Sequence, residues 1–290
     1  MGGIQNMKTI IVKNEKSDNL IEQFIALYLT LVGVSKNEKV TFDLTDTVWL
    51  YPMVILPIAS YIIKTKSEFK NSKNDKTKGY LDTIKFPKGI NSINEFSLRA
   101  QTHKNYVPIS ALERNKGLER EKLETMFSEM MIKSLGSVKG AESAILYPIG
   151  ELITNIFEHS NDDLGLVFGQ YYPKKSFLDI CIVDSGRGLR RAYAEDKNIQ
   201  VRDDEAIKKV LEGESIKAGK DRGYGVWTSK RMVCEALGGQ FILISGSAAF
   251  IASQKKQKLL NMPNFYWEGV IISYRIPKPA HKIDITPYLE

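Results

Sequence analysis

The segment from Ala141 to His159 sets the first requirement on the fold. Its apolar side chains recur at the three- and four-residue intervals of one helical face; they are Ile145, Ile149, Leu152, Ile153 and Ile156. Such a helix must bury this stripe against another layer. Glu151, Asn155 and His159 follow one another every four residues and share a different ridge. Taken alone, a polar ridge of this kind is more often a solvated face than a site.

A second cluster follows an apolar strand predicted for residues 176–186, which runs into the sequence Asp-Ser-Gly-Arg-Gly. Asp184, at the end of a buried strand, can accept a hydrogen bond from an exocyclic amine such as that of adenine. Gly186 and Gly188 would let the backbone approach a flat ligand. The alternative interpretation is a simple Asp-Ser-Gly turn.

A third cluster lies where Gly223 and Gly225, in the sequence Gly-Tyr-Gly-Val, open a predicted helix. A glycine-rich turn at a helix start offers free backbone N–H groups and the positive end of the helix dipole, which suit phosphate oxygens. Two glycines separated by one residue have no specificity by themselves. Their place in the order of the three clusters is the informative feature.

This ordered trio resembles the GHKL superfamily of gyrase, chaperone, histidine-kinase and mismatch-repair ATP-binding domains. The Glu-Asn-His ridge is most similar to the anti-sigma-factor serine kinase branch. The likeness covers residues 117–278, and the Walker loop of other ATPases is absent. It implies an α/β (α+β) fold, in which residues 117–290 form a two-layer sandwich of mixed sheet and helices with ATP and Mg²⁺ as cofactors. Two features depart from the family pattern: Val226 replaces the usual leucine, and residues 245–269 separate the last two strands by more than a tight hairpin.

The resemblance also implies a role for each residue of the polar ridge. Asn155 would ligate Mg²⁺, which bridges the nucleotide phosphates. Glu151 would orient or deprotonate the attacking water as general base. His159 would help to position the phosphates or Glu151, with a role at the helix end as the alternative. Slow ATP hydrolysis that is lost on Glu151→Ala is the corresponding prediction.

The same resemblance gives roles to the glycine-rich clusters. Asp184 would bind the adenine amine, while Gly186 and Gly188 would leave space beside the ring. The residues expected around the phosphates are Gly223, Tyr224, Gly225 and Val226. Residues 189–222 would form a lid over the nucleotide.

Residues 1–100 are predicted to form a smaller α/β domain, because strands and helices alternate along them. The predicted elements are strands over 7–12, 39–45 and 80–87, and helices over 19–34, from Pro52 and over 90–100. This order resembles the STAS-like modules of bacterial regulators. Thr47 is the nearest hydroxyl to the helix start at Pro52, which argues against the phosphorylation switch that such modules often carry. Residues 101–116 are predicted to be a polar connector.

Charge and hydropathy limit the classes of function. The formal net charge is +7, but no aromatic residues alternate with the basic ones as a single-strand groove would require. The longest apolar run, residues 49–63, contains two prolines and is shorter than the roughly 20 residues of a membrane helix. Cys181 and Cys234 are predicted to be buried free thiols, so a cytoplasmic location is expected.

The leading hypothesis is a regulator that binds ATP or ADP with Mg²⁺ and exposes or hides a surface for a partner protein. The phosphate would go to water, or to a serine or threonine of the partner. An autophosphorylating histidine kinase is not expected, because His103 lacks the helical surroundings of a phosphoacceptor. The alternatives are an interaction module with structural nucleotide or none, and a nucleic-acid-associated ATPase. A homodimer is compatible with each of them.

Overall fold

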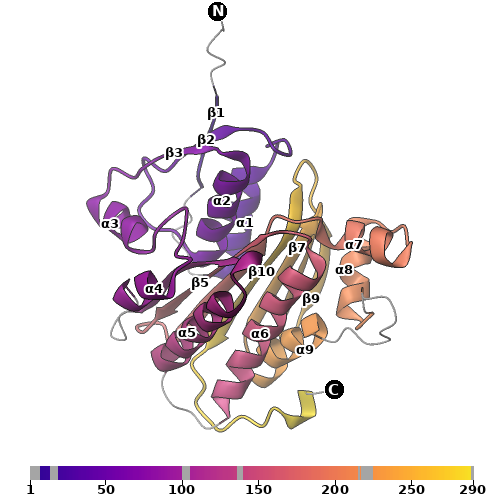
Figure 1. Cartoon of the computed structure of the whole chain (residues 1–290). Coiled ribbons are helices and arrows are strands. Elements are labelled where there is room, and N and C mark those ends of the chain that lie inside the picture. The colour runs from indigo at the N-terminus through magenta and orange to yellow at the C-terminus, as the bar shows by residue number, and fades with distance from the viewer. Residues whose placement is uncertain are drawn as a thin grey trace, which may run out of the picture.

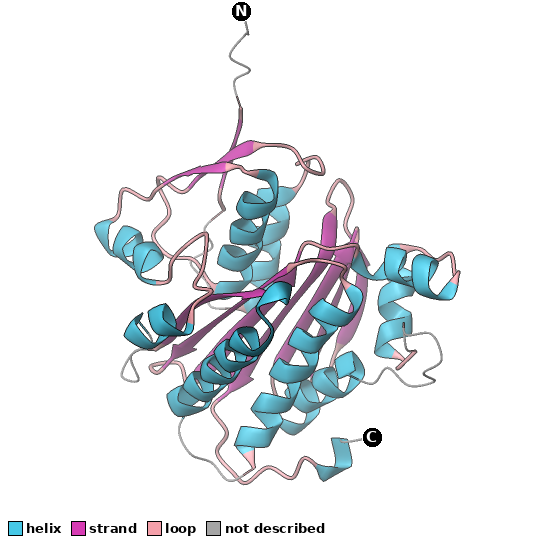
Figure 2. Cartoon of the chain, viewed as in Figure 1, coloured by secondary structure: helices cyan, strands magenta, loops and turns pink. Residues whose placement is uncertain are grey.

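A seven-stranded sheet crosses the middle of the protein, with helices on both faces and a small three-stranded sheet beyond one helical layer (Figures 1 and 2). The computed structural model describes residues 7–13, 19–99, 105–135, 140–214, 216 and 225–288. The large sheet has the order β4 (Tyr106–Glu113), β5 (Leu164–Tyr172), β6 (Phe177–Asp184), β10 (Trp267–Pro277), β7 (Gln240–Gly246), β8 (Ala248–Ser253) and β9 (Gln257–Asn261). The predicted α/β class is confirmed.

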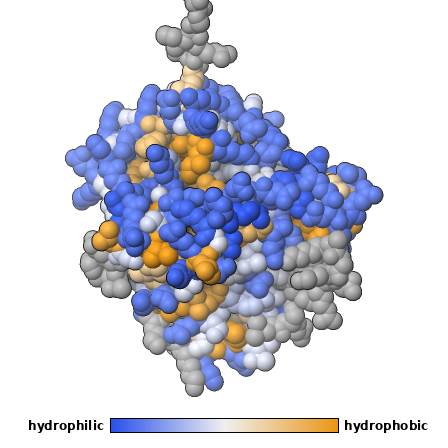
Figure 3. Space-filling model, viewed as in Figure 1, coloured by the Kyte–Doolittle hydropathy of each residue, from blue (hydrophilic) through white to orange (hydrophobic). Residues whose placement is uncertain are grey.

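The front face of the large sheet, which faces the viewer in Figure 1, carries the helices of the C-terminal part. They are α5 (Gly117–Leu135), α6 (Ala141–His159), α7 (Gly188–Lys197), α8 (Asp203–Leu211) and α9 (Gly225–Arg231), which continues as a π-helical turn over Met232–Ala236. The predicted bounds of α6 are confirmed, and its whole apolar stripe is buried in the front core. On the outer surface, hydrophilic residues cover much of the view in Figure 3, as expected for helices with one buried side.

The back face of the large sheet is covered by α1 (Leu20–Leu31) and α2 (Pro52–Thr65). Beyond them lies the parallel sheet of β1 (Lys8–Ile11), β2 (Val40–Asp43) and β3 (Glu68–Lys70). The Asn19 side chain caps α1, and Pro52 begins α2 as predicted. Because α2 lies between the two sheets, its residues from Pro52 to Ser60 are all buried.

Strand β6 explains how one sheet serves two cores. Successive side chains of a strand point to opposite faces. Ile180 and Ile182 accordingly pack in the front core, while Cys181 and Val183 pack in the back core with α1 and α2. Residues predicted as an N-terminal domain therefore share a hydrophobic core with the C-terminal sheet.

Two sequence predictions in the N-terminal half are wrong. In place of the first half of the strand predicted for 80–87, the structure has the end of α3 (Asp75–Thr83). The Asn74 side chain accepts hydrogen bonds from the amides of Lys76 and Thr77 and so starts this helix, which buries Leu81. The region predicted as a connector contains β4, whose apolar residues pair with β5. The short helix after residue 90 is confirmed as α4 (Ile93–Arg99).

The large sheet also differs from the expected mixed sheet, because each pairing between its strands is antiparallel. The segment between β7 and β10 forms β8 and β9, which extend the sheet by two strands. Cys181 and Cys234 are buried free thiols, as predicted, and burial raises the pKa of both, that of Cys234 to about 12. Among the helices of the described residues, none has the length and apolar character needed to cross a membrane.

A buried ion pair joins β6 to β10 and contacts α1. Asp179 is fully buried and accepts from Arg275 Nε at 2.6 Å and from Nη2 at 2.7 Å, while Gln23 Nε2 lies 3.4 Å from its second oxygen. We expect Arg275→Met to lower the free energy of unfolding by about 3 kcal/mol, because it leaves a buried carboxylate without its counter-charge. Urea denaturation measures this loss.

The matched control is Arg202→Met, since the Arg202 side chain is 72% exposed in its pair with Asp204. Exposed pairs contribute about 1 kcal/mol or less. A loss in Arg275→Met no larger than that in Arg202→Met would contradict the larger contribution expected of the buried pair.

Candidate functional site

A cavity of about 230 Å³ lies on the front face of the large sheet. Its floor is a row of cross-strand neighbours, Ile182 on β6, Ile272 on β10 and Leu243 on β7. One wall is α6, and the other is formed by α7, the end of α8 and the start of α9. Mostly apolar walls with a few converging polar groups are the usual make-up of a small-molecule site.

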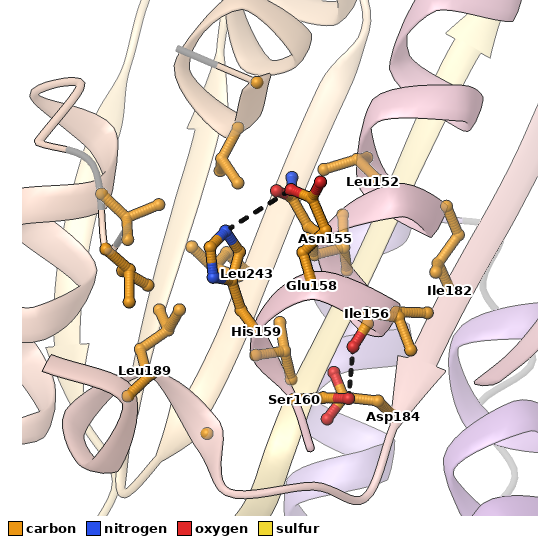
Figure 4. Close-up of a pocket in the computed structure, with 18 of the residues that line it drawn as sticks. Leu152, Asn155, Ile156, Glu158, His159, Ser160, Ile182, Asp184, Leu189 and Leu243 are labelled. Atoms are coloured by element: carbon orange, nitrogen blue, oxygen red, sulfur yellow. Dashed lines mark hydrogen bonds and ion pairs between the residues drawn. The ribbon is translucent and has the colours of Figure 1, made fainter. Parts of the chain in front are cut away.

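The polar ridge of α6 lines this cavity. Because the apolar stripe of α6 packs on the sheet, the ridge with Glu151, Asn155 and His159 is turned sideways into the space beside it. Figure 4 shows Asn155, Glu158 and His159 directed from α6 into the cavity. His159 Nε2 lies 4.0 Å from Glu158 Oε2. Glu158 was not among the predicted site residues.

The start of α9 closes the end of the cavity next to Glu151. A side-chain carbon placed on Gly225 would lie 2.6 Å from Glu151 Oε2 and 3.3 Å from Asn155 Nδ2. Glycine at this position therefore leaves room for both ridge residues. Val226 also lines the cavity, whereas Gly223 and Tyr224 lie outside the described residues.

The amide nitrogen of Asn155 is buried in the cavity wall. Its Nδ2 has no hydrogen-bond partner among the described residues. Leaving a buried polar group unpaired costs about 1–3 kcal/mol. A ligand that contacts this amide would remove that cost, so Asn155 is a candidate binding residue on energetic grounds as well as by position.

Asp184 reaches the cavity from the end of β6 and is only 3% exposed. Burial raises its pKa to about 7, and the negative charge of Asp162 acts in the same direction. The amide of Gly186 donates to Asp184 Oδ1 at 2.9 Å and opposes this shift. A buried carboxyl group with a raised pKa beside a cavity is a typical property of functional sites.

The two glycines after Asp184 have different surroundings. Gly188 lines the cavity, at a positive φ of 70°. Gly186 does not line it, contrary to the prediction of space beside a ring. A side-chain carbon on Gly186 would lie 2.1 Å from the carbonyl oxygen of Ser160, so glycine is needed there for packing against the end of α6.

Several residues that hold the site in place were missed by the sequence analysis. Trp267 Nε1 donates to the carbonyl oxygen of Asp184 at 3.0 Å, and a side-chain carbon on Gly269 would lie 2.7 Å from Asp184 Oδ1. The hydroxyl of Ser245 accepts from the Leu189 amide at 3.1 Å and donates to the Gly269 carbonyl at 2.9 Å. A glycine within a strand, as at position 269, was the available sequence signal for such a close approach.

The predicted lid begins with α7 and α8, and Glu214 and Ile216 beyond them line the cavity. Arg187 fastens this region to α6, because its Nε donates to the carbonyl oxygen of His159 at 2.7 Å. Its Nη1 donates to Glu195 and Asp196 at 2.8 Å each. The lid helix α7 and the end of the polar ridge are thereby joined through one side chain.

The capacity of the protein to bind a metal ion depends on the ligand types present. Within the described ranges, no group of three or more His, Cys, Asp or Glu side chains could hold a metal ion. Mg²⁺ bound together with phosphates needs no such cage, because it usually takes one or two protein oxygens and completes its shell with phosphate oxygens and water. A single amide oxygen from Asn155 fits that requirement.

Comparison with known proteins adds no relative. No family model matches the chain, and no curated protein matches it in sequence. The resemblance to GHKL domains and to STAS-like modules stays a prediction based on the residues quoted above.

Proposed function

We propose that the protein binds an adenine nucleotide with Mg²⁺ in the front cavity and uses the bound state to regulate a partner protein. One observation carries the proposal: three clusters far apart in the sequence converge on this cavity. Glu151 and Asn155 come from α6, Asp184 from the end of β6, and Gly225 from the start of α9. A cytoplasmic location belongs to this proposal.

The distribution of polar groups supports a nucleotide orientation. Asp184 lies two residues beyond Ile182 on β6, at the edge of the apolar floor, where a flat base could stack and its amine could donate to the carboxylate. Glu151 and Asn155 adjoin Gly225 at the α9 start. The phosphates and Mg²⁺ would occupy that end, with Asn155 as the protein ligand.

Glu151 would act as general base for a hydroxyl group, either of water or of a serine or threonine on the partner. Such a role requires a carboxylate beside the phosphates, and Glu151 Oε2 lies against Gly225 at the proposed phosphate end. Since α7 and α8 contribute cavity walls, a nucleotide that contacts them would favour one arrangement of the lid. That arrangement is the proposed signal to the partner.

The first test is Asn155→Ala, measured by isothermal titration with ATP in the presence and absence of Mg²⁺. We expect the variant to bind Mg-ATP about tenfold more weakly, because one metal ligand is lost. Binding of metal-free ATP should change much less. Asn94→Ala, on the exposed side of α4, is the control.

The outcome also separates the proposal from an interaction module that does not need nucleotide. If Asn155→Ala bound Mg-ATP as tightly as the parent protein, the metal role would be refuted. If the parent protein bound no ATP at all, the interaction module would be the better interpretation.

A further inference from the structure

We propose that Lys64 on α2 is a positioning residue for Asp184, and that the N-terminal layer thereby sets the preference of the site for adenine over other purine bases. This inference rests on the proposed nucleotide site. It assigns a role in ligand selection to a helix on the opposite face of the sheet from the cavity.

Strand geometry explains how the back layer reaches the site. Side chains alternate between the two faces, so Asp184 points to the front cavity and the next residue, Ser185, points towards α2. A displacement of Ser185 must move Asp184, because the two residues share a peptide bond. The back layer can therefore act on the cavity without contacting the ligand.

Three atoms of Ser185 are held by neighbouring side chains. Its amide donates to Asp162 Oδ2 at 2.9 Å, and its hydroxyl lies 2.6 Å from the hydroxyl of Ser60. Its carbonyl oxygen accepts a short hydrogen bond from Lys64 Nζ. Ser60 and Lys64 are one turn apart on α2, so this helix supplies two of the three contacts.

Lys64 is itself held in place by a charge network. Its Nζ lies 2.9 Å from Glu268 Oε2, and the Glu268 side chain is only 13% exposed. Glu268 also pairs with Lys36 at 2.5 Å and with Arg191 of α7 at 3.5 Å. The network therefore connects α2, β10 and the lid helix behind the Asp184 turn.

A separate hollow of about 410 Å³ contains these contacts and shares Ser160 with the front cavity. Its charged side chains pair with one another: Lys64 with Glu268, and Arg187 with Glu195. This pairing favours a structural coupling over a second ligand site. The coupling runs from α2 through the Ser185 backbone to the carboxyl group of Asp184.

A fixed carboxylate discriminates between purines by chemistry at one position. Adenine presents an amine there, which donates to the carboxylate, whereas hypoxanthine presents a carbonyl oxygen, which the carboxylate repels. If the Asp184 turn became loose, the carboxylate could move away from the carbonyl oxygen. Loss of the contacts between α2 and Ser185 should therefore reduce the preference for ATP over inosine triphosphate more than it reduces binding through the phosphates.

The experiment compares the affinities of the whole chain for ATP and for inosine triphosphate, both with Mg²⁺, by isothermal titration at pH 8, where Asp184 is ionised. We expect the parent protein to prefer ATP by about 100-fold or more, and Lys64→Met to reduce this ratio about tenfold. Lys64→Arg should restore most of the preference, because arginine can still donate to the Ser185 carbonyl. Lys70→Met is the control, since Lys70 lies on β3 of the same layer and pairs with Asp43 at 3.4 Å.

Ser60→Ala provides a second variant that removes a single hydroxyl contact and keeps the test valid if Lys64→Met destabilises the protein. It should lower the ratio by a smaller factor. Hydrogen exchange without nucleotide gives an independent readout, because the amides of Ser185 and Gly186 should exchange faster in both variants but not in Lys70→Met.

The outcomes distinguish the inference from the proposed function. A parent protein that prefers ATP, with the same preference in Lys64→Met and Ser60→Ala, would overturn the inference alone. A parent protein that binds neither nucleotide would overturn the proposed function and the selectivity role with it.

Discussion

Replacement of Glu151 by glutamine is expected to reduce ATP hydrolysis by about 10²- to 10⁴-fold, the usual contribution of a general base. Glutamine keeps the size of the side chain but cannot take a proton from the attacking hydroxyl group. Glu151 Oε2 lies at the start of α9, beside Asn155, where the phosphates are proposed to bind. ATP affinity should change by less than about threefold, since the lost interaction acts in the transition state.

The measurement is phosphate release by the purified variant at saturating Mg-ATP. Glu142→Gln is the matched control, because Glu142 lies exposed in the first turn of the same helix. It should leave the rate unchanged. Turnover in Glu151→Gln equal to that of the parent protein would exclude Glu151 as the general base.

Asp184→Asn is expected to stabilise the protein above pH 7 while weakening ATP binding. The pKa of Asp184 is raised in the folded protein from its ordinary value of 3.8 to about 7. Between these values the folded state holds the proton more tightly than the unfolded state, so stability contributed by this group falls as pH rises. Above pH 7 the penalty is complete, at an upper limit of about 4 kcal/mol. Asparagine removes this titration.

Urea denaturation of the parent protein and Asp184→Asn at pH 5 and pH 8 tests the sign. The advantage of the variant should be smaller at pH 5, where the unfolded carboxyl group is mostly ionised but the folded one is not and only part of the penalty has developed, and larger at pH 8. Other titrating groups occur in both proteins and largely cancel in the difference. A difference that did not grow with pH would contradict the raised pKa.

ATP binding should change in the opposite direction. The asparagine amide can turn an N–H group towards the adenine amine, so we expect affinity to fall by about 10- to 100-fold. Binding to the parent protein should strengthen as pH rises through about 7, because the ionised carboxylate is the better acceptor. The variant should lose this pH dependence. Asp163→Asn, at a side chain that is 99% exposed, is the control.

Higher stability together with weaker ATP binding in Asp184→Asn would show that the ionised carboxyl group of Asp184 lowers the stability of the folded protein. A carboxyl group buried at the cavity edge is unfavourable for the folded state alone, and a ligand amine would offset that cost. Many functional residues lower stability in this way. Asn155 Nδ2, which is buried and has no hydrogen-bond partner in the described part of the chain, belongs to the same category.

The sequence predicted best those elements whose signal is local. The stripe of α6 repeats at helical spacing, and its predicted bounds agree with the structure. The strand before Asp184 is apolar except for Asp179, and β6 is buried along its whole length. The strand predicted for 80–87 was wrong in its first half. Its apolar residues suit a strand, but the Asn74 cap begins a helix that extends to Thr83.

Residues 101–116 were misinterpreted for a different reason. Polar residues suggested a connector, but β4 is stabilised by pairing with β5, in which Leu164 lies opposite Glu113 and Gln170 opposite Tyr106. Strand pairing of this kind depends on a partner that the local sequence does not identify. The role of Gly186 was misjudged likewise, since its neighbour is Ser160 at the end of α6.

By itself, the sequence determined the helix and strand periods and the identity and order of the three polar and glycine clusters, because these properties lie within short segments. The tertiary structure alone decided that the clusters line one cavity and that α2 holds the turn behind Asp184. The Ser60–Ser185 contact joins residues 125 positions apart. No local period encodes such a contact, since it exists only when both faces of one sheet are covered.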